Sequence, residues 1–306
     1  MTETGRRPDF LLIGAQKSGT SWLWRMLRQH PDTLLPDTKE LHYFGAAELY
    51  AKGPESYYGH FAGIPRDKVT GEASTALFFD RVPYWYNAAR QIEYDPTLPP
   101  LPELVHRDLP DARIIAVLRD PVRRAISAYQ HWMRRGDVWP LAGLRRTAQR
   151  IPKLRILEYG DYARHLGAWR KVWPQEGILV LVFEEDVVAD PANGLRKVYE
   201  FLGLDASFQA QAPERSVHRS WSWTRSAVAW HAGPLRKLVS RPPLGPWLDR
   251  NDFLRRFALS RQDIEFLRAR YLPDHVAVEQ LAGRSLGAWD YGDRLLHGRQ
   301  PVRQAG

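Results

Sequence analysis

Residues 16–21 are the part of the chain whose side chains are best suited to binding a phosphate group. They combine an amide, a lysine, a glycine and three hydroxyl groups: Gln16, Lys17, Ser18, Gly19, Thr20 and Ser21. The lysine supplies a mobile positive charge, and the hydroxyl groups can donate hydrogen bonds to anionic oxygens. This combination predicts an anion-binding segment.

The residues on either side predict how this segment is held. The apolar run Phe10-Leu11-Leu12-Ile13 indicates a short buried strand that ends at Gly14. Apolar residues then recur at helical spacing from Trp22 to Leu27, and Pro31 closes the segment. A strand, a glycine-bounded loop and a helix turn backbone N–H groups and a helix N-terminus toward an anion. We therefore expect a P-loop-like phosphate-binding loop.

The loop differs from that of nucleotide triphosphatases. In their pattern, GxxxxGK[ST], the lysine directly follows the second glycine and the next hydroxyl binds magnesium. Here Gly14 and Gly19 have the right spacing, but Thr20 follows Gly19 and Lys17 precedes it. The ten histidines show no HExxH motif. The sequence thus argues against a metal-assisted kinase or ATPase and predicts no metal site.

A second candidate anchor lies at the end of the strongest predicted strand, residues 112–118. Arg119 follows this strand, and a helix with Pro121 in its first turn comes next. Ligands of open parallel sheets bind beyond the carboxyl ends of the strands. Arg119 can therefore form a bidentate hydrogen bond to a phosphate, and Ser127, two turns into the helix, can donate to the same group.

The order of elements predicts an α/β fold with a doubly wound parallel sheet. Besides the strands at 10–13 and 112–118, we expect a short strand near Gly71-Glu72 and a buried strand at 177–183. Helices are expected at 122–134, 159–172 and 190–202. Residues 81–110 are proline-rich and aromatic, which predicts an irregular excursion. We expect one domain over 1–306, with an α/β core at 9–212 and a helical, Arg/Trp-rich extension at 213–306.

These motifs, in this order, resemble the sulfotransferase family, whose donor is 3′-phosphoadenosine 5′-phosphosulfate (PAPS). The resemblance covers roughly residues 9–220 and is nearest to the glycosaminoglycan and bacterial branch. Further matches are Lys39-Glu40-Leu41-His42-Tyr43-Phe44, Gly71-Glu72, Gly160-Asp161-Tyr162 with Trp169, and the strand end at 181–186. The Arg-Lys-Gly triplet near the C-terminus of the cytosolic branch is absent. The resemblance implies PAPS as cofactor and PAP as product.

The resemblance also implies roles for individual residues. Lys17 would neutralise the bridging oxygen as the S–O bond breaks, and residues 16–21 would hold the 5′-phosphosulfate. Arg119 and Ser127 match the family's 3′-phosphate motif, and Arg219 is a further candidate for that end of the nucleotide. Trp22 falls at the adenine-stacking position, although it also suits the first core position of its helix.

Two residues compete for the role of catalytic base. Glu40 matches the glutamate of the glycan-modifying relatives, whereas His42 is similar in type to the histidine base of the cytosolic branch. A glutamate needs burial to raise its pKa for this task, and Tyr43-Phe44 could provide it. Glu72 lies where glycan relatives carry a Glu-Lys pair, but Ala73 replaces the lysine. An ordinary ion-pair partner is the alternative interpretation of Glu72.

The acceptor is predicted only as a class: a carbohydrate, a lipid or a secondary metabolite. A set of aromatic residues suits stacking on sugar or aromatic faces, and core packing explains many of them equally well. They are Tyr84, Trp85, Tyr86, Tyr94, Trp132, Trp139, Trp221 and Trp223.

Composition restricts the remaining function classes. The chain of 306 residues has no cysteine, which excludes disulfides and thiolate chemistry. No apolar run approaches the roughly 20 residues of a membrane span, and no signal core is present, so a cytoplasmic and bacterial protein is expected. Residues 213–306 hold sixteen Lys/Arg against nine Asp/Glu. A nucleic-acid-binding protein and a phosphotransferase are the alternatives to a sulfotransferase, and we expect no nucleic-acid partner.

Overall fold

Four parallel strands form the sheet in a computed structural model that describes residues 5–83, 93–139, 142–211, 221–233, 236–239, 241–254 and 259–297. They are β1 (Phe10–Gly14), β2 (Gly71–Ala73), β3 (Arg113–Leu118) and β4 (Ile178–Val182), in the order β2-β1-β3-β4. Leu12 pairs with Ala73 on one side and with Ile115 on the other. From β1 the chain first forms β2 on one side of β1 and then β3 and β4 on the other side, as in a doubly wound sheet.

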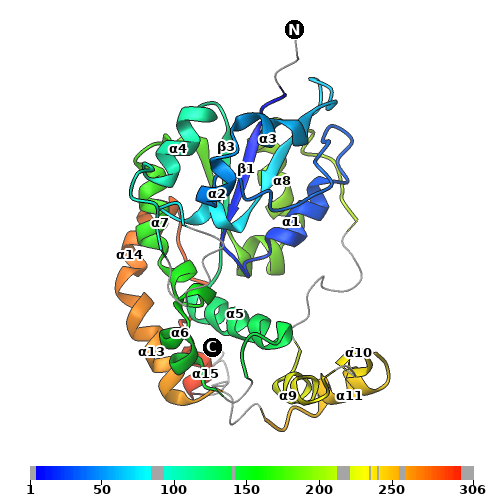
Figure 1. The fold of residues 1–306 in the computed structure, drawn as a ribbon, viewed down its shortest axis with the longest axis vertical. Coiled ribbons are helices and arrows are strands. Elements are labelled where there is room, and N and C mark those ends of the chain that lie inside the picture. Colours follow the sequence, from blue (N-terminus) through cyan, green and yellow to red (C-terminus); the bar gives the residue numbers. More distant parts are fainter. Residues whose placement is uncertain are drawn as a thin grey trace, which may run out of the picture. The chain divides into compact units, whose positions relative to one another are not determined.

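Helices of one contact-defined unit cover both faces of this sheet. The unit comprises Met1–Arg119, Asp161–Val217 and His275–Ala288, and we call it the sheet unit. Figure 1 shows α1 and α8 on one side of the strands and α4 and α7 on the other. The helices of this unit are α1 (Thr20–Leu27), α2 (Ala47–Tyr50), α3 (Pro54–Tyr58), α4 (Leu101–Asp108), α7 (Tyr162–Arg170), α8 (Pro191–Leu202) and α14 (His275–Ala282).

The apolar runs of the sequence explain the core of the sheet unit. Residues 114–118 of β3 are completely buried, as expected for a strand covered on both faces. One cluster joins alternate residues of β1, β3 and β4 to α1 and α8. Its members include Phe10, Leu12, Leu23, Leu27, Ile115, Val117, Leu181, Leu195 and Val198. Proline in the first turn and Gly203 after the last turn delimit α8 as the sequence predicts.

The second unit is helical and comprises Asp120–Gly160, His218–Asp274 and Trp289–Gly306; we call it the helical unit. Asp120 caps its first helix by accepting from the N–H groups of Val122 and Arg123, at 2.9 and 3.1 Å. The same carboxylate accepts from the N–H groups of Asp290 and Tyr291. The helices are α5 (Pro121–Arg135), α6 (Leu144–Arg150), α9 (Trp223–His231), α10 (Arg236–Val239), α11 (Leu244–Arg250), α13 (Arg261–Tyr271) and α15 (Asp293–His297).

Two features differ from the sequence predictions. Residues 81–110 are not irregular throughout, because α4 occupies residues 101–108 with Pro102 in its first turn, where a proline costs no hydrogen bond. The grouping of segments into units has no border at 212/213, because residues 120–160 group with the C-terminal helices and residues 275–288 with the sheet; the single domain expected over 1–306 stays a prediction. Within the described residues, no helix is long and apolar enough to cross a membrane.

Candidate active site

The predicted phosphate-binding loop lies at the carboxyl end of β1, where the strand order reverses. Lys17 and Gly19 have left-handed backbone conformations, with φ of 69° and 94°. The Ala15 N–H donates to the Val117 carbonyl at 2.8 Å, which fixes the start of the loop against β3. A side chain at Gly19 would lie 3.0 Å from the Phe183 ring. The loop therefore needs glycine at this position both for its conformation and for space.

A buried donor group makes the loop suitable for a phosphate-bearing ligand. Among the described residues, the Ser18 hydroxyl is buried without a hydrogen-bond partner. The first N–H groups of α1, which begins at Thr20, have no partner within the helix either. A phosphate at the loop would satisfy such donors and meet the positive end of the helix dipole. In the described part of the chain, no three His, Asp or Glu side chains gather to hold a metal ion.

Arg119 contacts the loop directly. Its Nη1 donates to the Lys17 carbonyl at 3.0 Å, and its guanidinium lies 4.6 Å from the centroid of the Phe183 ring. Glu184 adds a carboxylate 3.9 Å from its Nε. Tyr162 donates to the Arg119 carbonyl at 2.8 Å. The structure thus brings the two predicted anchor segments together through an arginine that fixes the backbone of Lys17.

Phe183 and Glu184 were not among the site residues predicted from the sequence. They begin the π-helix Phe183–Ala189, directly after β4. The predicted strand at 177–183 ends at this point, and parallel strands present their carboxyl ends at one edge of the sheet. Because the carboxyl ends of the parallel strands meet at one edge, the end of the predicted strand at 177–183 could have identified Phe183 and Glu184 as site residues.

Three further predicted residues have different outcomes. Trp22 is partly buried and packs against the core cluster of α1 and α8, which agrees with a core role and leaves adenine stacking a prediction. Ser127 is 8% exposed on α5 and belongs to the helical unit, whereas Arg119 belongs to the sheet unit. Their shared contact with a 3′-phosphate stays a prediction. Arg219 lies outside the described residues.

Glu40 and His42 lie together in a turn that is neither a strand nor a helix. Both have left-handed backbone conformations, with φ of 65° and 60°. The Glu40 N–H donates to the Ala73 carbonyl at 3.0 Å, which attaches the turn to the carboxyl end of β2. Lys39 Nζ lies 2.5 Å from Glu40 Oε1, and His42 Nε2 lies 3.8 Å from Oε2. Both candidate bases are therefore one strand away from the loop.

The environments of the two candidates differ. The Glu40 side chain is 34% exposed, so the burial expected from Tyr43-Phe44 is not found. Tyr43 instead stacks on Tyr57, with ring centroids 4.9 Å apart. Burial lowers the pKa of His42, an effect that Glu40 partly opposes. A histidine with a lowered pKa is neutral at pH 7 and can accept a proton.

Glu72 is a buried carboxyl group beneath this turn, and its partner is a tyrosine, where the alternative interpretation expected an ordinary ion pair. It is 1% exposed, and Tyr57 donates to its Oε2 at 2.7 Å. Burial raises the pKa of Glu72 to about 7, although the Tyr57 hydroxyl and the backbone of Leu41 and His42 oppose the shift. Glu72 thus supports the segment that carries both candidate bases.

Replacing Glu72 by glutamine should change how stability depends on pH. The pKa of Glu72 is higher in the folded protein, about 7, than the ordinary value of 4.5. The folded state then binds this proton more tightly, so stability decreases as pH rises from about 4.5 to 7, by about 3 kcal/mol in total. Urea unfolding of Glu72→Gln at pH 5 and 8 should show a smaller decrease than the parent protein.

The control for this measurement is Glu265→Gln, which changes a half-exposed carboxylate on α13. It should preserve the pH dependence of the parent protein. Equal pH slopes for Glu72→Gln and the parent protein would mean that Glu72 does not titrate in this range.

Only part of the predicted aromatic set is described, and its members have several different environments. Trp223 is 3% exposed and packs against Tyr129, so it is a core residue. Trp132 donates to the Leu154 carbonyl at 2.9 Å, and Trp221 lies under Arg225. Trp139 is 45% exposed. Tyr84, Trp85 and Tyr86 lie outside the described residues, so acceptor stacking stays a prediction.

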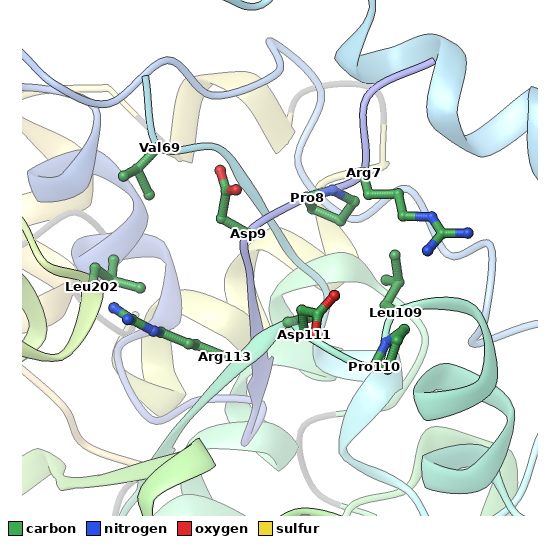
Figure 2. A pocket seen from close by; sticks show the side chains of 10 residues that line it. Arg7, Pro8, Asp9, Val69, Leu109, Pro110, Asp111, Arg113 and Leu202 are labelled. Carbon is green, nitrogen blue, oxygen red and sulfur yellow. The ribbon is translucent and has the colours of Figure 1, made fainter. Parts of the chain in front are cut away.

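A cavity of about 410 Å³ in the sheet unit lies away from this chemistry (Figure 2). Asp9 and Arg113, which line it, stand at the start of β1 and β3. The loop and Arg119 follow the ends of the same strands. The cavity is therefore at the amino edge of the sheet, opposite to the candidate active site.

Curated relatives of the chain are named as sulfotransferases. Heparan sulfate glucosamine 3-O-sulfotransferase 3B1 of Mus musculus is 32% identical over 202 residues, which are 64% of this chain and 46% of that protein. Bifunctional heparan sulfate N-deacetylase/N-sulfotransferase 2 of Bos taurus is 30% identical over 219 residues, 65% of this chain and 22% of that protein. The chain thus matches less than half the length of either relative.

A solved structure and a family model are similar to this chain over a larger part of its length than the two relatives. The crystal structure of a sulfotransferase from Alicyclobacillus acidocaldarius has a TM-score of 0.64 and 25% identity, and the likeness covers 93% of this chain and 99% of that one. The model of the sulfotransferase domain matches residues 7–226, which include the loop, the Glu40 turn and Arg119. With its parallel sheet and its phosphate-binding loop at the strand reversal, this chain belongs to the sulfotransferase domain family.

Proposed function

We propose that this chain transfers a sulfuryl group from PAPS to a hydroxyl or amine group of a carbohydrate. The observation that carries the proposal is the loop of Lys17, Ser18 and Gly19, which offers a buried hydroxyl and a helix N-terminus at the carboxyl edge of the sheet. The named activities of the relatives, on heparan sulfate, support a carbohydrate acceptor. One relative is named for O-sulfation and the other for N-sulfation, so we include both groups.

Residues of the loop would hold the donor. The Ser18 and Thr20 hydroxyl groups and the first N–H groups of α1 would bind its 5′-phosphate, and Lys17 would face the bridging oxygen. When bound, PAPS supplies the sulfuryl group and a phosphate leaving group. The Lys17 ammonium would stabilise negative charge on the bridging oxygen. Arg119 contributes by fixing the Lys17 carbonyl, and Arg119, Ser127 and Arg219 remain our candidates for the 3′-phosphate.

The turn after Lys39 would act on the acceptor. We assign the general base to Glu40, whose carboxylate would take the proton of the acceptor as its oxygen or nitrogen bonds to sulfur. The electron pair of the breaking S–O bond remains on the phosphate oxygen, next to Lys17. Lys39 and His42 flank the Glu40 carboxylate and orient it. His42 is the alternative base.

Calorimetric titration with PAP, the desulfated product, tests the donor site. We expect saturable binding that Lys17→Ala and Arg119→Ala each weaken by about 10- to 100-fold, the usual effect of losing a charge-assisted hydrogen bond. Lys171→Ala removes an exposed lysine at the end of α7 and should leave PAP binding unchanged.

ATP with Mg²⁺ is the control ligand for the same titration. Because the loop lacks a lysine after Gly19, ATP should not reproduce the binding of PAP. Binding of Mg-ATP without binding of PAP would contradict the proposal and favour a phosphotransferase.

A further inference from the structure

In the helical unit, an unusual number of large apolar side chains are exposed on the bundle of α9, α10 and α11 and on the residues that follow α11. They are Val228, Trp230, Leu238, Leu244, Trp247 and Phe253, with exposed fractions between 37% and 60%. Leu244 and Trp247 are neighbours on α11, and the rings of Trp247 and Phe253 meet edge to face at 6.4 Å. Single exposed apolar residues are ordinary, but six of them in one short part of the chain, two with their rings in contact, are more than a soluble surface usually exposes.

The interior of the bundle explains why these side chains are outside. Among the described residues, its buried apolar cluster consists of Ala229, Val239 and Leu248, with Trp221 and Ala232 packed against it. Arg225 fills much of the remaining space: it is 8% exposed, donates to the Val239 carbonyl at 3.1 Å and pairs with Asp249 at 2.6 Å. The bundle thus packs around a buried arginine and a few apolar residues, while Trp230, Trp247 and Phe253 are exposed and can contact another molecule.

The charge of the bundle indicates what that partner is. Residues 221–256 contain seven Lys/Arg and two Asp, a surplus of five positive charges. Both aspartates bond inward, Asp249 to Arg225 and the N–H of Ser222, and Asp252 to Thr224. Arg241 and Arg250 are exposed. Among the described residues, the outside of the bundle therefore combines exposed Trp, Phe and Leu with the exposed arginines Arg241 and Arg250.

We propose that the six exposed apolar residues named above, together with Arg241 and Arg250, form a surface that binds an anionic lipid membrane. Tryptophan, phenylalanine and leucine insert at the boundary between headgroups and acyl chains, and lysine and arginine bind anionic headgroups. A second copy of the chain would bring two positive surfaces together, which is unfavourable. A nucleic acid would use the arginines but not the exposed leucines and valine.

Vesicle flotation of the full chain tests this surface. The protein should float with vesicles of phosphatidylcholine mixed with phosphatidylglycerol, and much less with vesicles of phosphatidylcholine alone. Trp247→Ser combined with Phe253→Ser should weaken binding to the mixed vesicles by about tenfold or more. Arg241→Glu combined with Arg250→Glu should weaken it too, and high salt should weaken binding of the parent protein.

The matched control is Leu34→Ser combined with Val276→Ser, two apolar residues of the sheet unit that are 46% and 62% exposed. This variant should float like the parent protein, and all variants should keep PAP binding and thermal midpoint, which shows that they are folded. Equal binding by the Trp247/Phe253 variant, or equal binding to neutral vesicles, would overturn the proposal. The proposal would also be overturned if the parent protein were a dimer, the Trp247/Phe253 variant were a monomer, and neither protein bound vesicles.

Discussion

Replacing Lys17 by alanine is expected to lower the rate of sulfuryl transfer by about 10²–10³-fold, the usual cost of removing one preorganised charge at a reacting oxygen. Lys17 lies in the loop after β1, with its backbone in a left-handed conformation and its carbonyl held by Arg119. This geometry keeps the residue in place before any ligand arrives. The ammonium group should therefore act mainly in the transition state, and kcat should decrease more than the affinity for PAPS.

The measurement is release of PAP from PAPS, with heparan sulfate as the acceptor probe and with water as an acceptor-independent reaction. Lys171→Ala, at the exposed end of α7, is the control and should keep the parent rate. A Lys17→Ala protein that binds PAP less tightly but turns over at the parent rate would show that Lys17 only binds the donor.

Local signals were sufficient to predict the elements that hold the donor site. The apolar run before Gly14, the strand before Arg119 and the Pro191–Gly203 boundaries of α8 each depend on a few neighbouring residues. Parallel strands present their ends at one edge, so the proximity of the loop and Arg119 followed from the sequence as well. The contact itself, from Arg119 to the Lys17 carbonyl, did not, because it depends on the positive φ of Lys17.

The acceptor side depended on contacts between distant parts of the chain. The turn at Glu40 and His42 is fixed by the Ala73 carbonyl on β2, and the buried Glu72 of β2 is hydrogen-bonded by Tyr57 of α3. Neither of these two contacts produces a periodic pattern in the sequence. Helix α4 was missed for a simpler reason, because its prolines were interpreted as breakers although a first helical turn tolerates them. The cytoplasmic location and bacterial origin expected from the sequence stay predictions.

Replacing Glu40 by glutamine is expected to lower the transfer rate by about 10²–10³-fold while PAP binding is unchanged, because a general base typically contributes about 10²–10⁴-fold. Glutamine keeps the size of the side chain and its hydrogen bonding to Lys39, but it cannot take a proton. The backbone contact to Ala73, which holds the turn, is also kept. The loss should therefore appear in kcat with heparan sulfate as the acceptor probe.

His42→Ala is the comparison that separates the two candidate bases. If Glu40 takes the proton, His42→Ala removes an orienting contact 3.8 Å from the Glu40 carboxylate and a contact with Ser74 but no reacting group, and the rate should decrease by about tenfold or less. Burial lowers the pKa of His42, so the imidazole is neutral near pH 7. It therefore cannot replace the positive charge that Lys39 places beside Glu40. If the two effects are reversed, and the acidic limb of the pH–rate profile disappears in His42→Ala but persists in Glu40→Gln, the base is His42. Because both side chains belong to one turn, this comparison decides which atom receives the proton without changing how the turn is attached to β2.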